Sequence, residues 1–61
     1  MVRRRDFDRQ MRQRGWKRIG VIEAGPATFV KWVKGERVIF APNHDLMTPH
    51  TAHKLLGEAE G

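Results

Sequence analysis

Three runs rich in β-branched and aromatic residues follow one another with only short turns between them, and this spacing constrains the fold more than any other feature. The runs are Lys17–Glu23, Thr28–Val33 and Arg37–Ala41. Gly25-Pro26 and Lys34-Gly35 separate them and are typical of tight turns. Parallel neighbours would need crossover connections of roughly a dozen residues. The sequence therefore predicts a three-stranded antiparallel sheet that stops at Pro42, which cannot donate a hydrogen bond to a ladder.

Helical patterns lie on both sides of these runs. Residues 6–14 are predicted to be helical, with Asp6 as the N-cap and Gly15 as the left-handed residue beyond the end. Thr48 and Pro49 predict the N-cap and the first residue of a second helix. Its apolar face has helical spacing and consists of Ala52, Leu55, Leu56 and Ala59. The predicted fold class is α+β, a two-layer α-β-β-β-α domain with both helices on one face of the sheet.

At 61 residues, the chain has room for one small domain. We expect a basic N-terminal tail over residues 1–5 and a single domain over residues 6–61. The tail either reaches across a nucleic-acid groove or is disordered. The chain contains no cysteine, which excludes disulfides and cysteine-ligated zinc and favours a reducing cytoplasm. No apolar run approaches the roughly 18 residues of a membrane span.

Positive charge is concentrated in the first third of the chain. Residues 1–18 contain eight arginines and lysines against two aspartates, whereas the remainder contains four basic and five acidic residues. The formal net charge of +5 therefore comes entirely from the first 18 residues. Such a focus, with a sequence pI near 10.8, is typical of proteins that bind phosphates, although solubility alone explains the same composition.

Arginines form a stripe on the first predicted helix. At 100° per residue, Arg5, Arg9 and Arg12 fall within about 60° of arc, opposite Phe7 and Met11. A second basic patch is predicted where His50, His53 and Lys54 share a face of the last helix. The residues predicted to contact nucleic acid are Arg3, Arg4, Arg5, Arg9, Arg12, Lys17, His50, His53 and Lys54. A solvated charged face is the competing interpretation of the same residues.

The order of these elements, together with several short motifs, is similar to one known family. Asp6–Trp16 looks like a first helix that ends in Gly-Trp, and Gly25–Phe29 falls where that family has Gly-Ser-His before its second strand. Gly35–His44 resembles its hairpin turn, third strand and Pro-x-His exit, and Leu46–Leu56 resembles the start of its last helix. On these residues the chain resembles the HicA/YcfA-like small toxins from Arg5 to about Glu60. The resemblance implies a double-stranded-RNA-binding-domain-like fold, RNA as the bound nucleic acid and an antitoxin-like protein partner.

The chain departs from that family at the residue that carries catalysis. Family members that cleave RNA use the histidine of Gly-Ser-His, and this position is Ala27 here. Alanine cannot transfer a proton, and the neighbouring Thr28 is a poor base at neutral pH. No histidine precedes His44, so we predict a non-catalytic module with no catalytic residue. The alternative is a HicA-like mRNA interferase that uses His44 as its base, with Asp45 orienting it.

His50 and His53 are three residues apart, but a metal site needs further ligands, so neither a metal nor a cofactor is predicted. Trp16 is expected beneath the sheet. Trp32 is ambiguous, because both faces of Thr28–Val33 are apolar enough to be buried. If one face is exposed, the chain would use it or a sheet edge for a homodimer or a protein partner. A phage or mobile-element protein that regulates a host protein is therefore another alternative.

Overall fold

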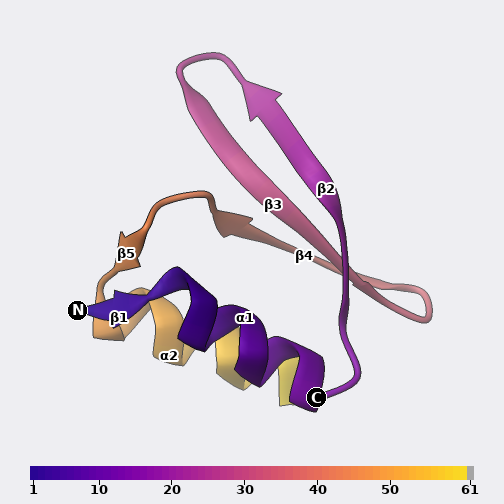
Figure 1. Cartoon of the computed structure of the whole chain (residues 1–61). Coiled ribbons are helices and arrows are strands. Elements are labelled where there is room, and N and C mark those ends of the chain that lie inside the picture. Colours follow the sequence, from indigo (N-terminus) through magenta and orange to yellow (C-terminus); the bar gives the residue numbers. More distant parts are fainter. Residues whose placement is uncertain (61) are drawn as a thin grey trace.

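The computed structural model describes residues 1–60 and contains a small α+β domain (Figure 1). Two helices and a three-stranded antiparallel sheet are present, as predicted, together with a short additional strand pair. In chain order the elements are β1 (Val2–Arg3), α1 (Arg4–Gln13), β2 (Lys17–Ala24), β3 (Ala27–Lys34), β4 (Arg37–Pro42), β5 (Leu46–Met47) and α2 (Pro49–Glu60). No helix within residues 1–60 has the length and apolar character needed to cross a membrane.

The three main strands form a meander in the order β2-β3-β4. Two-residue turns connect them, because Ala24 pairs with Ala27 and Lys34 pairs with Arg37. Gly25 and Gly35 open these turns with φ of +62° and +60°. Hairpin turns that match the right-handed twist of the strands require a positive φ at this position, which glycine adopts at little cost. The turns predicted from sequence are therefore confirmed.

The N-terminal residues differ from the predicted tail. Val2 and Arg3 pair with Met47 and Leu46 as the antiparallel strands β1 and β5. α1 then begins at Arg4, so Asp6 lies in its first turn instead of at the N-cap. The backbone N–H of Arg4 donates to the carbonyl of Asp45 at 2.9 Å. A two-residue pair is too short to leave a periodic pattern in the sequence, which is why it was not predicted.

The other predicted helix boundaries are confirmed. Gly15 has φ of +88°. Its N–H donates to the carbonyl of Arg12, and the N–H of Trp16 donates to the carbonyl of Met11. This pair of hydrogen bonds is the Schellman motif that ends helices. At α2, Thr48 Oγ1 accepts the N–H of Thr51 at 3.2 Å, as an N-cap does.

The core lies between the helices and one face of the sheet. On that face Val30 pairs with Ala41 and Trp32 with Ile39, and all four are buried. α1 and α2 lie side by side with their N-terminal ends at the same end of the molecule (Figure 1). Trp32 therefore faces inward, which the alternation of the strand alone did not decide. The core residues are Phe7, Met11, Trp16, Val30, Trp32, Ile39, Ala41, Met47, Ala52 and Ala59.

Candidate nucleic-acid interface

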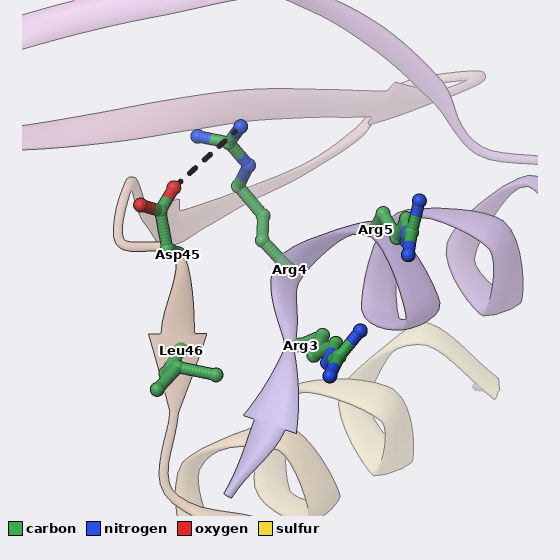
Figure 2. A pocket seen from close by; sticks show the side chains of 5 residues that line it. All are labelled: Arg3, Arg4, Arg5, Asp45 and Leu46. Carbon is green, nitrogen blue, oxygen red and sulfur yellow. Dashed lines mark ion pairs between the residues drawn. The ribbon is translucent and has the colours of Figure 1, made fainter.

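Three consecutive arginines surround a pocket at the N-terminal end of α1. The pocket has a volume of about 330 Å³ and is lined by Arg3, Arg4, Arg5, Asp45 and Leu46 (Figure 2). The pairing of β1 with β5 creates it, because this pairing places the start of α1 beside the segment that precedes α2. Its lining therefore contains three cationic side chains and one acidic side chain.

The three arginines have different roles. Arg4 turns toward Asp45, with 4.0 Å between Nη2 and Oδ1 (Figure 2). Its Nη1 also donates to Asn43 Oδ1 at 2.8 Å. Arg4 therefore fastens α1 to the β4–β5 connection. Arg3 and Arg5 lie on the side of β1 that faces away from Asp45 (Figure 2). Neither of them forms an ion pair within residues 1–60.

The end of α1 adds to the positive potential around Arg3 and Arg5. Arg3 is the N-cap residue and makes no side-chain capping hydrogen bond. The first N–H groups of a helix that lack such a cap carry partial positive charge. Asp6 lies in the first turn, but Arg9 pairs with it at 3.6 Å and offsets its charge. The surface at this end of α1 is therefore cationic overall.

The predicted arginine stripe is not a uniform row. Arg5 is free of ion pairs within the described chain, whereas Arg9 is engaged by Asp6. The guanidinium of Arg12 lies 5.7 Å from the centre of the Trp32 ring, which is a cation–π geometry. The next arginine in the sequence, Arg14, pairs with Glu60 at 3.1 Å. The stripe is thus divided into one freely available arginine and two that are already in contact with other side chains.

The second predicted patch lies on the N-terminal half of α2. His50, His53 and Lys54 are all exposed there. Because the two helices begin at the same end of the molecule, this patch and the Arg3–Arg5 pocket belong to the same end (Figure 1). Lys17 instead begins β2 after the C-terminal end of α1, a helix about 15 Å long. The structure therefore brings together the two helix starts and separates Lys17 from them.

The histidine considered for catalysis stands alone. His44 is exposed, and its side chain makes no hydrogen bond or ion pair with any residue that the structure describes. Ala27, at the position of the family's catalytic histidine, is exposed at the start of β3 next to the Gly25-Pro26 turn. Within residues 1–60, no group of three His, Asp or Glu side chains is placed to hold a metal ion.

Two sets of contacts, one at each end of the helices, left no trace in the sequence. Asn43 and Asp45 hold Arg4 across roughly 40 residues of chain, a separation that local patterns do not reveal. Arg37 lies 5.2 Å from the centre of the Trp16 ring and donates to the Glu58 carbonyl. Arg4, Arg14 and Arg37 thus stabilise the fold, so net charge alone overstates the cations available to a ligand.

No protein-family model, curated protein or solved structure matches this chain. Its function is therefore inferred from the charges and surfaces of the residues themselves.

Proposed function

We propose that the protein is a non-catalytic nucleic-acid-binding module that contacts the phosphates of a duplex, RNA in preference to DNA. Arg3 and Arg5 make the main contacts, and the N-terminal half of α2, with His50, His53 and Lys54, makes the second. The observation that carries this proposal is the pair of guanidinium groups, without an ion pair inside residues 1–60, at the start of α1, which has no side-chain cap. Phosphate contacts of this kind give affinity with little sequence preference.

The choice of RNA rests on the resemblance of the sequence to the HicA-like toxins. A three-stranded antiparallel sheet with two neighbouring helices that begin at the same end is compatible with the two-layer, double-stranded-RNA-binding-domain-like fold of the HicA-like toxins. The proposal therefore includes that the chain adopts this fold. The A-form RNA duplex exposes phosphates and 2′-hydroxyls across a wide minor groove, which suits recognition by shape.

The test is fluorescence anisotropy with labelled RNA and DNA duplexes over a series of salt concentrations. The double variant Arg3→Gln/Arg5→Gln is compared with Lys31→Gln/Lys34→Gln, which removes the same charge from β3. Each lost phosphate contact lowers the log–log salt slope by about 0.9. We expect the first variant to reduce the slope by up to about 2 and the second to leave it near the wild-type value.

Equal losses in both variants would mean that net charge alone drives binding, and no binding by the wild type at low salt would remove the proposal. A stronger interaction with DNA would correct the choice of RNA. The same samples on a denaturing gel test the alternative enzyme, since cleavage that disappears in His44→Ala would establish His44 as a catalytic base.

A further inference from the structure

The free edge of β2 is the least protected strand edge of the three-stranded sheet. β2 has eight residues and pairs on one side only, with β3. Every residue of β2 except Gly20 is exposed. The other edge strand, β4, is shorter and ends in Pro42, and its Arg37 is bonded to the Glu58 carbonyl in α2. An uncovered edge offers unpaired N–H and C=O groups to another strand.

Apolar side chains are exposed along this same edge. Ile19 is 60% exposed, Val21 48% and Ile22 39%. Val21 pairs with Val30 and so points to the side of the sheet that carries the core, whereas Ile22 pairs with Phe29 and points to the other side. The hairpin of β2 and β3 projects beyond the helices (Figure 1). The helices therefore leave both faces of β2 without a cover.

Charge is arranged along β2 so that the strand complements itself. Arg18 lies near its start and Glu23 near its end. Arg18 pairs with Trp32 and Glu23 with Thr28, so both side chains are on the core side of the sheet. The β-bulge between Arg18 and Gly20 allows this, because it shifts the alternation of side chains by one residue. Two antiparallel copies of β2 would thus place Arg18 of each copy beside Glu23 of the other.

We infer that β2 pairs with β2 of a second copy of this chain to form a dimer with a continuous six-stranded sheet. The two-fold axis passes through the Val21 pair. Gly20 then faces Ile22 of the second copy, and a Cβ placed on Gly20 meets nothing within 4 Å, so there is room for that side chain. Glu23 faces the bulge formed by Arg18 and Ile19 of the second copy. In each of these pairs the two side chains lie on the same face of the sheet. A shift of the register by one residue would place them on opposite faces.

The charge arrangement favours a second copy over a different partner. Protective devices on an edge strand, such as basic residues and bulges, are confined here to Lys17–Gly20. Val21–Ala24 has neither a basic residue nor a bulge, and its one charged residue is the acid that Arg18 of a second copy would meet. Because the axis is perpendicular to the sheet, the helices of both copies lie on the same side. The inference concerns a surface outside the proposed phosphate contacts and does not depend on them.

The test is sedimentation equilibrium of the full chain from micromolar to millimolar concentration, with circular dichroism to confirm folding. Glu23→Arg and Arg18→Glu each replace two opposite-charge pairs by like-charge pairs, and we expect each to raise the dimer Kd about tenfold or more. The double variant Arg18→Glu/Glu23→Arg restores the opposite charges and should return Kd to near the wild-type value. Val21→Lys should abolish the dimer, whereas Val38→Lys, 46% exposed on β4, should not.

A wild-type chain that stays monomeric at millimolar concentration would overturn the inference. The inference would also be overturned if the dimer Kd of the double variant were as high as that of the single variants. The proposed register places residue 18 beside residue 23 of the second copy, so restoring opposite charges must restore the affinity. Dissociation by Val38→Lys but not by Val21→Lys would place the interface on β4 instead. The charge-reversal series remains decisive even if Val21→Lys fails to fold, since residues 18 and 23 are exposed in the monomer.

Discussion

Two glycines in different conformations should respond to alanine with opposite changes in stability. Gly15 has φ of +88° and ends α1, whereas Gly57 lies inside α2. An L-residue in the left-handed region costs roughly 1–2 kcal/mol. The lower conformational entropy of the unfolded alanine chain returns about 0.4–1 kcal/mol of this. The net expectation for Gly15→Ala is a loss of about 1 kcal/mol in the free energy of unfolding.

Packing around the two sites supports this difference. A Cβ on Gly15 would lie 3.3 Å from Cε of Lys34, a flexible side chain that can move. The cost therefore comes from the backbone and not from a collision. A Cβ on Gly57 meets nothing within 4 Å, and alanine is favoured over glycine in a helix interior by about 0.8–1.0 kcal/mol. Gly57→Ala should gain about that amount.

Thermal unfolding at one fixed protein concentration measures both changes. For a domain of this size, 1 kcal/mol corresponds to roughly 4–8 °C in Tm. Gly15→Ala should melt about 5 °C below the wild type and Gly57→Ala about 5 °C above it. A Gly15→Ala variant as stable as the wild type would show that α1 does not end in the left-handed turn. A destabilised Gly57→Ala would show that this face of α2 is covered.

The remaining predictions concern buried side chains, capping and the arginine stripe. Trp16→Phe removes the hydrogen bond from Nε1 to the Ala59 carbonyl, whereas Trp32→Phe removes a buried Nε1 with no partner among the described residues. Urea unfolding should therefore show that the first variant loses more stability, by about 1 kcal/mol. Thr48→Ala should cost about 1 kcal/mol in the same assay through loss of the α2 N-cap, while Thr48→Ser should cost less. Arg9→Gln should reduce the salt slope of duplex binding less than Arg5→Gln in the anisotropy assay, because Asp6 already pairs with Arg9.

The sequence predicted those features that depend on neighbouring residues. The hairpin turns at Gly25 and Gly35 and the end of α1 at Gly15 each follow from a backbone conformation that glycine adopts readily. The N-cap at Thr48 is equally local. Features that join distant segments were not predictable in this way. The β1–β5 pair and the contacts of Arg4 with Asn43 and Asp45 depend on how the finished domain closes.

The candidate site shows the same limit in its electrostatics. Helical periodicity located Arg5, Arg9 and Arg12 on one side of α1, but periodicity carries no information on which of them meets an acid or a ring. Arg9 is held by Asp6 three residues away, which the sequence spacing allows. Arg12 contacts the ring of Trp32 on another element, and the spacing of residues in the sequence does not reveal this contact. Only tertiary structure identifies Arg5 as the member of the stripe without such a contact.

The division of the basic residues into structural and available cations changes what the net charge means. Arg4, Arg14 and Arg37 use their guanidinium groups on Asn43, Glu60 and the Glu58 carbonyl. A long-range attraction to phosphate depends on the sum of all charges, and these three contribute to it. Short-range contacts that fix a duplex in place require groups free to reorient toward it, and these three would first have to give up their partners. All arginines therefore contribute to steering, whereas positioning depends on the available ones, so variants of Arg14 should affect mainly the rate of association and variants of Arg5 both this rate and the lifetime of the complex.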